Sequence, residues 1–239
     1  MNPEPSERPV ALITGASAGL GLALAHGLAA RGWVLVIDAR GAEALKAAAD
    51  ALAARTDVVP LAGDVTDPEH RADLLDAITE LGRLDLLVNN ASYLGPSPLQ
   101  PLAAADLDEL RRVYEVDVLA PLALTQLLLP ALTKESGVLI NISSDAAVEA
   151  YETWGGYGSA KAALDHATKV LAAEHPALAV YAVDPGDLRT AMHQAAFPGE
   201  DISDRPEPAT VVPAFLQLLD KRPASGRYRA ADFAPAVTS

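Results

Sequence analysis

Cysteine is absent from the 239-residue chain, which excludes disulfides, thiolate metal sites and cysteine nucleophiles. The five histidines show no HxxxH or HxxE spacing, so we expect no metal site. Basic side chains are also scarce, since 18 Lys and Arg stand against 32 Asp and Glu, for a formal net charge of −14. This sign disfavours binding to nucleic acid or to an anionic membrane surface.

The chain also lacks a long apolar run. The start, MNPEPSERP, has no apolar core of the kind found in a secretory signal peptide. The leucine-rich uncharged run at residues 118–133 contains two prolines and is 16 residues long, which is too short to span a bilayer. We interpret it as a buried helix and expect a cytoplasmic protein.

Short runs rich in Val, Ile and Leu alternate with helical patterns along the whole chain. Such runs are typical of strands that are buried on both faces. The predicted strands are residues 9–14, 33–38, 57–62, 84–89, 137–142, 177–183 and 226–230. The predicted helices are residues 19–31, 42–54, 66–81, 106–133, 155–174 and 208–220, and two of them open on motifs like a capping box, TDPE (66–69) and DLDE (106–109).

This alternation predicts an α/β fold, with one Rossmann-like domain over residues 1–239. We expect a doubly wound parallel sheet of about seven strands with helices on both faces. Residues 1–8 are interpreted as a polar tail. Residues 188–208, with a polar, proline-containing part at 195–208, are expected to form a lid over the substrate, and an ordinary surface loop is the alternative.

A glycine-rich turn, TGASAGLG (14–21), follows the first predicted strand. Gly15, Gly19 and Gly21 allow a tight turn and let backbone N–H groups approach a pyrophosphate at the start of a helix. The spacing is GxxxGxG, not the GxGxxG of longer dinucleotide-binding proteins. The turn therefore predicts a dinucleotide site.

In GYGSAK (156–161), Tyr157 precedes Lys161 by four residues, which places both side chains on one face of a helix. A nearby cation lowers the pKa of a phenol from about 10, and a phenol tuned in this way can serve as a general acid or base. Taken alone, this spacing is more often an ordinary amphipathic helix.

Six motifs together, in order and spacing, resemble the short-chain dehydrogenase/reductase family in its short single-domain branch. They are TGASAGLG (14–21), DV (64–65), NNAS (89–92), ISS (142–144), YGSAK (157–161) and DPGDLRT (184–190). The resemblance covers about residues 9–230. It implies an NAD(P)-dependent oxidoreductase that moves a hydride between a nicotinamide and a small carbonyl or secondary-alcohol substrate, working as a homodimer or homotetramer.

The resemblance also implies roles for single residues. Tyr157 would exchange a proton with the substrate oxygen, Ser144 would position that oxygen, and Lys161 would bind the nicotinamide ribose and lower the Tyr157 pKa. The other implied cofactor-binding positions are Gly15, Ser17, Gly19, Leu20, Gly21, Arg40, Asp64, Val65, Asn90, Ala91, Pro185, Gly186 and Thr190.

Two residues depart from the family pattern. Asp117 stands where the family has its fourth catalytic residue, usually an Asn that helps to hold a water linking the lysine to solvent. A carboxylate near Lys161 would change the proton affinities of the Tyr–Lys pair, so we expect weakened or pH-shifted catalysis. Ser92 replaces the usual final glycine of NNAG and would crowd the ribose or offer a hydrogen bond. Harmless drift is the alternative for both.

Residues 38–40 bear on the choice of cofactor. An acid at the end of the second strand binds the 2′-hydroxyl of NAD, whereas an Arg accepts the 2′-phosphate of NADP. The discriminating position of the family falls on Ala39 and the next one on Arg40, which favours NADP(H). NAD remains the alternative, because a shift of one residue would make Asp38 the discriminator.

Several aromatic and neighbouring residues are candidates to line a substrate pocket: Tyr93, Tyr151, Glu152, Trp154, Met192, His193 and Phe197. They would suit an apolar or ring-bearing carbonyl compound, or they would only pack within the lid. The sequence thus favours an NADPH-dependent carbonyl reductase. The alternatives are a cofactor-binding sensor or scaffold whose catalysis is weakened by Asp117, and an epimerase or dehydratase, against which the short chain and the glycine spacing count.

Overall fold

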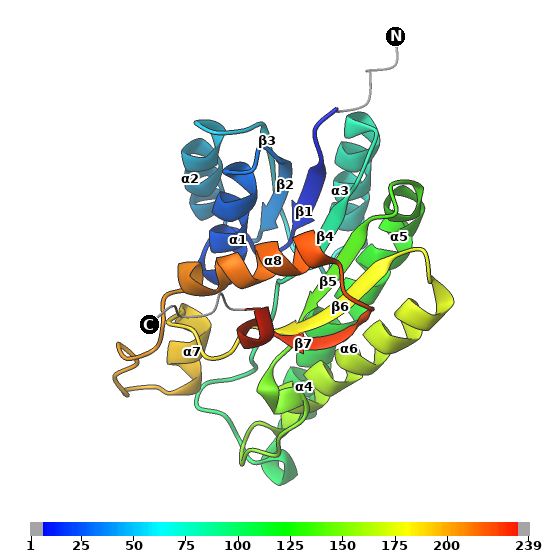
Figure 1. The fold of residues 1–239 in the computed structure, drawn as a ribbon. Coiled ribbons are helices and arrows are strands. Elements are labelled where there is room, and N and C mark those ends of the chain that lie inside the picture. Colours follow the sequence, from blue (N-terminus) through cyan, green and yellow to red (C-terminus); the bar gives the residue numbers. More distant parts are fainter. Residues whose placement is uncertain (1–6, 234–239) are drawn as a thin grey trace, which may run out of the picture.

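The structure is a computed structural model that describes residues 7–233 of the chain. Seven parallel strands form its centre in the order β3-β2-β1-β4-β5-β6-β7 (Figure 1). They are β1 (Val10–Ile13), β2 (Val34–Ala39), β3 (Val58–Ala62), β4 (Leu86–Asn89), β5 (Val138–Ile142), β6 (Ala179–Asp184) and β7 (Gly226–Arg229). The predicted doubly wound sheet is therefore confirmed. The strand order reverses between β1 and β4, and in such sheets that reversal leaves a crevice at the carboxyl ends of the strands.

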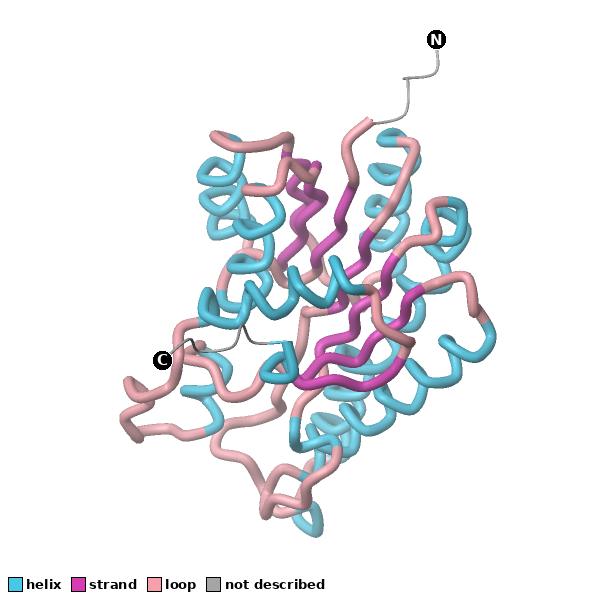
Figure 2. Tube along the Cα trace, viewed as in Figure 1, coloured by secondary structure: helices cyan, strands magenta, loops and turns pink. Residues whose placement is uncertain are grey.

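Helices cover both faces of the sheet, as Figures 1 and 2 show. On one face lie α1 (Gly19–Ala29), α2 (Ala42–Ala53) and α8 (Val212–Lys221), and on the other lie α3 (Pro68–Leu81), α5 (Ala120–Lys134) and α6 (Gly155–Glu174). Two shorter helices, α4 (Leu107–Tyr114) and α7 (Ala191–Ala196), complete the set of named α-helices. Of the predicted lid, only α7 is an α-helix.

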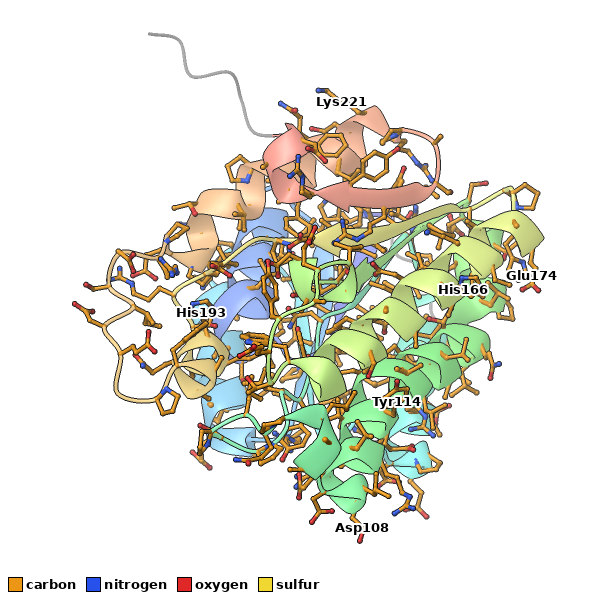
Figure 3. The ribbon with its side chains drawn as sticks, turned by 90° about the horizontal axis from the view of Figure 1, so that it is seen from below. Asp108, Tyr114, His166, Glu174, His193 and Lys221 are labelled. Atoms are coloured by element: carbon orange, nitrogen blue, oxygen red, sulfur yellow. The ribbon has the colours of Figure 1, made fainter. Side chains whose placement is uncertain are left out.

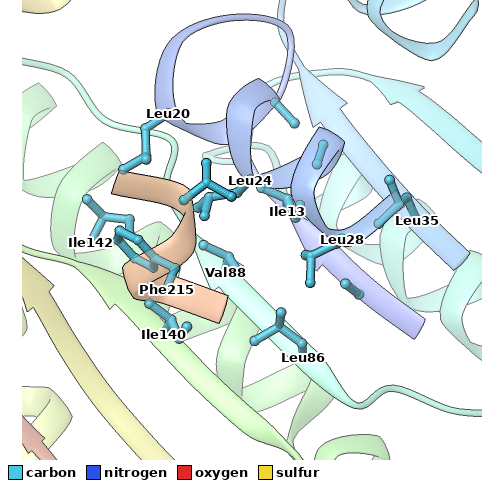
Figure 4. Packing of buried hydrophobic residues seen from close by; sticks show 14 of the residues in the cluster. Ile13, Leu20, Leu24, Leu28, Leu35, Leu86, Val88, Ile140, Ile142 and Phe215 are labelled. Carbon is cyan, nitrogen blue, oxygen red and sulfur yellow. The ribbon is translucent and has the colours of Figure 1, made fainter. Parts of the chain in front are cut away.

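The two faces have separate cores because side chains alternate along each strand. Ile13 of β1 belongs to the same buried cluster as Leu24 of α1 and Phe215 of α8 (Figure 4). Its neighbour Leu12 points the other way and packs with Leu128 of α5. Each strand is thus buried on both faces of the sheet, which explains the unbroken apolar runs in the sequence.

The start of α3 differs from the prediction by one residue. Asp67, not Thr66, is the N-cap, and its carboxylate accepts the Glu69 N–H at 2.9 Å. The Thr66 N–H instead donates to Asp64 at 2.9 Å, so the preceding turn takes Thr66 away from the helix. At α4 the predicted cap, Asp106, is in place.

The prediction that the apolar run is too short for a bilayer is wrong as an argument from length. Helix is continuous over 28 residues, from Leu107 to Lys134, because one turn of π-helix (Glu115–Leu119) joins α4 to α5, and an 18-residue window of this helix has a mean hydropathy of 1.6. Length and composition alone would allow this helix to cross a membrane. Its Leu124, Leu128 and Leu132 are buried against the sheet, which is the packing of a core helix.

Candidate active site

A cavity of about 490 Å³ opens at the carboxyl ends of the strands, within the size range of small-molecule sites. All the predicted catalytic and cofactor-binding residues line it except two, Gly21 and Asp117. Those that line it are Gly15, Ser17, Gly19, Leu20, Arg40, Asp64, Val65, Asn90, Ala91, Ser144, Tyr157, Lys161, Pro185, Gly186 and Thr190. The strand order thus gathers residues that are up to 175 positions apart.

The glycine-rich turn lies pressed against the end of β4. Gly15 has a φ of +65°, and a Cβ placed there would lie 2.9 Å from the Ala91 Cα. A Cβ on Gly21 would lie 2.6 Å from both the Asn90 Nδ2 and the Gly15 carbonyl oxygen. Ala18, the N-cap of α1, has no side chain that could accept the first N–H groups of the helix. The turn therefore offers a close backbone surface and free helix N–H groups, which is what a pyrophosphate requires.

Asn90 supports this turn with its side chain. Its Nδ2 donates to the carbonyl oxygens of Thr14 at 2.7 Å and Gly15 at 3.1 Å. In return, the Thr14 hydroxyl oxygen accepts the N–H groups of Asn90 and Ala91, both at 2.9 Å. The position assigned to the ribose by resemblance thus has its amide engaged in holding the loop.

Asp38 is held beneath the turn by a residue that the sequence analysis missed. Asp38 is fully buried; its Oδ1 accepts the Gly15 N–H at 2.8 Å, and its Oδ2 lies 3.0 Å from the His70 Nε2. Burial raises the Asp38 pKa against the opposing effects of His70 and Gly15, and the hydrogen bond to Asp38 raises the His70 pKa. Gly63 leaves room for the ring, since a Cβ there would lie 2.2 Å from the His70 Nδ1. No short spacing in the sequence marks this contact.

Arg40 lies at the rim of the cavity with its side chain exposed. Its neighbour Asp64 accepts hydrogen bonds from the Thr66 N–H and hydroxyl. Burial alone would raise the Asp64 pKa, but the Thr66 hydrogen bonds and the Arg40 charge bring it below its usual value. Arg112 also lowers the Asp64 pKa, so an anion at this rim would meet the Arg40 guanidinium and the Asp64 carboxylate, with the Arg112 charge nearby.

Tyr157 and Lys161 project from α6 toward the end of β5, where Ser144 lies. The Lys161 Nζ donates to the Ile142 carbonyl oxygen at 3.0 Å and lies 3.2 Å from the Asp117 Oδ1. It is 5.4 Å from the centre of the Tyr157 ring. The Ser144 hydroxyl donates to Asp145 at 3.0 Å and accepts the Ala146 N–H at 3.2 Å. The predicted serine, tyrosine and lysine are thus brought together on one wall.

Burial raises the pKa of Tyr157, Lys161 lowers it, and Asp117 raises it, so that it ends above the usual value. Lys161 acts in the expected direction, but burial together with Asp117 outweighs it. For Lys161 itself, burial lowers the pKa, yet the anionic neighbours raise it further than burial lowers it. The resting site therefore combines a protonated phenol with a protonated amine.

The two departures from the family pattern contact each other. Asp117 lies in the π-helical turn and is fully buried, and such turns are frequent at functional sites. Its carboxylate accepts the Ser92 hydroxyl and lies 3.3 Å from the Tyr93 backbone nitrogen. The two residues are 25 positions apart in the sequence, and only the fold makes them partners.

Aromatic rings form the wall beyond Tyr157. The Trp154 ring centre lies 6.0 Å from those of Tyr157 and Phe197, and His193 lies 5.0 Å from Phe197. The Nε2 of His193 is buried and has no hydrogen-bond partner within residues 7–233. Among the candidate substrate residues, Tyr93, Trp154, Met192 and His193 line the cavity, whereas Tyr151, Glu152 and Phe197 do not.

Arg227 of β7 braces the catalytic wall from behind, and the sequence analysis missed it. Its guanidinium donates to the Ser144 carbonyl oxygen and to Asp165, each at 2.9 Å, and lies 3.5 Å from Asp184. Asp184 in turn accepts the Gly186 N–H at 2.9 Å. One side chain thus ties three segments of the site together.

Comparison with known proteins gives a consistent result. The family model described as short chain dehydrogenase matches residues 9–201. Sepiapterin reductase of Mus musculus is 36% identical over 201 residues, which cover 78% of this chain and 77% of that protein. A short-chain dehydrogenase structure from Shigella flexneri 2a, complexed with NADP, matches with a TM-score of 0.87 and 30% identity over 97% of this chain and 100% of the other. The alcohol dehydrogenase of Thermococcus sibiricus, complexed with 5-hydroxy-NADP, matches with a TM-score of 0.84 and 26% identity over 93% and 96%.

Proposed function

Since the chain belongs to the short-chain dehydrogenase family, a family of NAD(P)-binding oxidoreductases, we propose that it reduces a carbonyl compound to a secondary alcohol with NADPH. One observation carries this proposal. Ser144, Tyr157 and Lys161 meet on the wall of a cavity whose far end is a glycine-lined helix N-terminus. Proton donor and dinucleotide cradle thus share one space, in which a substrate would lie between them.

The residues of the cavity fit a nicotinamide dinucleotide. The turn from Gly15 to Leu20 would hold the pyrophosphate at the start of α1. Glycine at position 15 allows this turn, because a Cβ there would collide with Ala91. Asp64 and Val65 would hold the adenine, and Lys161 the nicotinamide ribose. When bound in its reduced form, the nicotinamide supplies a hydride, with its electron pair, to the carbonyl carbon.

The preference for NADP(H) over NAD(H) rests on residues 38–40. Asp38 is fully buried, and both of its carboxylate oxygens are engaged, by Gly15 and by His70. It is therefore poorly placed to bind a ribose 2′-hydroxyl. Arg40 is exposed at the rim, where it would pair with a 2′-phosphate. The NADP-complexed relatives agree with this preference.

Tyr157 would act as the acid of the reduction. Its pKa is raised by burial, so the phenol keeps its proton at neutral pH and can give it to the substrate oxygen. Ser144 would hold that oxygen by a hydrogen bond, for which its hydroxyl must turn away from Asp145. The aromatic wall formed by the partly buried Trp154 and by Tyr157 favours an apolar or ring-bearing carbonyl compound.

The remaining parts of the proposal concern how the enzyme is organised. We assign residues 1–239 to one domain and residues 188–208, which include α7, to a substrate lid, and we place the protein in the cytoplasm. The outer faces of α4, α5 and α6 would form the surface of a homodimer or homotetramer (Figure 3). These helices carry the exposed apolar side chains Leu107, Leu127 and Val170, and the π-helical turn between α4 and α5 adds Leu119.

A titration with NADPH and with NADH, followed by nicotinamide fluorescence, tests the cofactor part of the proposal. Wild-type protein should prefer NADPH. Arg40→Ala should weaken NADPH binding about tenfold, the effect of about 1.4 kcal/mol, and leave NADH binding unchanged. The control is Arg55→Ala, an exposed arginine outside the cavity. Equal binding of both cofactors by wild type would contradict the role of Arg40.

Turnover of a panel of ketones and aldehydes tests the reaction itself. A cofactor-binding sensor is the second candidate, and one observation favours it: Asp117 lies 3.2 Å from the lysine and offsets its charge. NADPH binding without any turnover of the panel would favour the sensor. Binding of neither cofactor would contradict both.

A further inference from the structure

The geometry points to Ser92 as a positioning residue for the proton donor Tyr157. We propose that the Ser92 hydroxyl donates its hydrogen bond to the Asp117 carboxylate while Tyr157 is protonated. Once Tyr157 has given its proton to the substrate, the hydroxyl donates to the Tyr157 phenolate instead. This inference rests on the proposed function, because it concerns what happens to Tyr157 after the substrate oxygen is protonated.

Ser92 lies between the two acceptors. Its hydroxyl donates to the Asp117 Oδ1, and the same residue lines the cavity beside Tyr157. The same Asp117 Oδ1 lies 3.2 Å from the Lys161 Nζ, which is 5.4 Å from the centre of the Tyr157 ring, so Ser92 and Tyr157 share one corner of the cavity. Ser92 favours the ionised form of the phenol and so lowers the Tyr157 pKa. A serine hydroxyl has only one proton, so it can serve one of these two oxygens at a time.

The state of Tyr157 decides which acceptor wins. A protonated phenol is neutral and donates a hydrogen bond itself, so the Asp117 carboxylate is then the stronger acceptor. When the Tyr157 O–H bond breaks and its proton joins the substrate oxygen, a buried phenolate remains. The phenolate needs a donor, and the Ser92 hydroxyl would supply one by turning from Asp117 toward the phenolate while its own O–H bond stays intact.

Asp117 can lose the hydrogen bond from Ser92 because it retains other partners. The Lys161 Nζ lies 3.2 Å from its Oδ1, and the Tyr93 N–H reaches it at 3.3 Å. Asp117 is fully buried, and a buried carboxylate without partners would be unfavourable. With Lys161 and Tyr93 in place, the loss of the serine hydrogen bond is tolerable.

The charged groups around Tyr157 come from three elements. Lys161 on α6 lowers the phenol pKa, whereas Asp117 on the π-helical turn and Asp145 after β5 raise it. Ser92, after β4, is the uncharged member of this set and lowers the pKa. It therefore compensates in part for the carboxylate that it contacts. This accounts for why a serine stands beside an aspartate here.

The test is a pH titration of the Tyr157 ring by NMR, with 13C at the Cζ of tyrosine, in protein without cofactor or substrate. The chain has six tyrosines, and the signal lost in Tyr157→Phe identifies the one required. The Ser92 variants are made in Asp117→Asn protein, which serves as their parent. Removing the carboxylate lowers the Tyr157 midpoint, and the Ser92 hydroxyl can then donate to the phenolate without competition from a charged acceptor. Ser92→Ala and Ser92→Thr are then added to this parent, and Ser92→Gly replaces Ser92→Ala if the alanine variant fails to fold.

Loss of the hydroxyl should raise the Tyr157 midpoint by about one to two pH units, the range expected for a hydrogen bond to a charged group. Ser92→Thr retains a hydroxyl and should restore the midpoint of the parent. In protein that retains Asp117, Ser92→Ala should shift the midpoint less, since Asp117 then competes for the proton. A midpoint that is the same with and without the hydroxyl in the Asp117→Asn parent would overturn the inference.

This titration separates the inference from the proposed function, because it needs no turnover. If wild type binds NADPH but reduces no carbonyl compound, the proposed reaction fails while the NMR result still decides the role of Ser92. If turnover is found, the alkaline limb of alcohol oxidation should move with the NMR midpoint, and KM should stay the same. A lower thermal stability of Ser92→Ala with an unmoved midpoint would assign Ser92 a structural role only, against the inference.

Discussion

Replacing His70 by leucine should destabilise the protein strongly, because it leaves Asp38 buried with one partner lost. Asp38 is fully buried and His70 is 5% exposed, and their side chains are 3.0 Å apart. Removing one member of such a buried pair typically costs about 3–5 kcal/mol. The N–H of Gly15 remains as a partner at 2.8 Å, so we expect the lower part of that range. The urea midpoint, followed by circular dichroism, measures the loss.

The pH dependence of the same variant gives a second check. The His70 pKa is raised above the unfolded value of 6.5 by Asp38, so the folded protein binds that proton more tightly. The resulting stability is fully present below about pH 6.5 and is lost as the pH rises through the folded-state value. The difference in stability between wild type and His70→Leu should therefore shrink toward alkaline pH.

Two controls isolate the cause. Lys46→Met breaks an exposed pair with Asp50 and should leave the urea midpoint unchanged. Adding Asp38→Asn to His70→Leu removes the unpaired charge and keeps an acceptor for Gly15, so part of the lost stability should return. A urea midpoint of His70→Leu equal to that of Lys46→Met, or a double variant no more stable than His70→Leu, would show that Asp38 does not depend on His70.

Three further predictions concern the loop, the brace and the proposed assembly surface. Gly21→Ala should weaken NADPH binding at least tenfold and lower the melting temperature, because its Cβ would lie 2.6 Å from the Asn90 side chain; an unchanged titration would contradict this close fit. Arg227→Met should lower both melting temperature and kcat, since it leaves Asp165 and the Ser144 carbonyl without their donor; wild-type values of both would show that the brace is dispensable. Leu119→Glu should yield monomers in light scattering, and an unchanged oligomer would place the interface elsewhere.

The sheet could be predicted from the sequence because its signal is local. The strand from Val34 to Ala39 is apolar over most of its length, and it is buried at every position. The first residue of a helix is harder to predict, because neighbouring residues compete for the N-cap position, as Thr66 and Asp67 show. The sequence offers both Thr66 and Asp67 as caps, and only the turn around Asp64 decides between them. The helix predicted over residues 106–133 is continuous, and the π-helical turn within it is a feature that no local pattern marks.

The residues of the site were largely predictable by type and much less by partner. Gly15, Tyr157 and Lys161 belong to short motifs, whose spacing can be recognised in the sequence without knowledge of the surrounding packing. The contact of His70 with Asp38 joins residues 32 positions apart, and the contact of Ser92 with Asp117 joins residues 25 positions apart. Nothing in the local pattern of either segment marks such a contact.

The sequence by itself determined the alternation of strands and helices, the glycine turn and the tyrosine–lysine spacing, because each depends on neighbours within a few residues. Only the tertiary structure decided the electrostatics of the site. It buried Tyr157 deeply enough to raise its pKa against the lysine charge, set Asp117 beside Lys161, and closed Asp38 beneath the loop. Burial and distance between remote residues exist only once the parallel sheet has brought its carboxyl ends together.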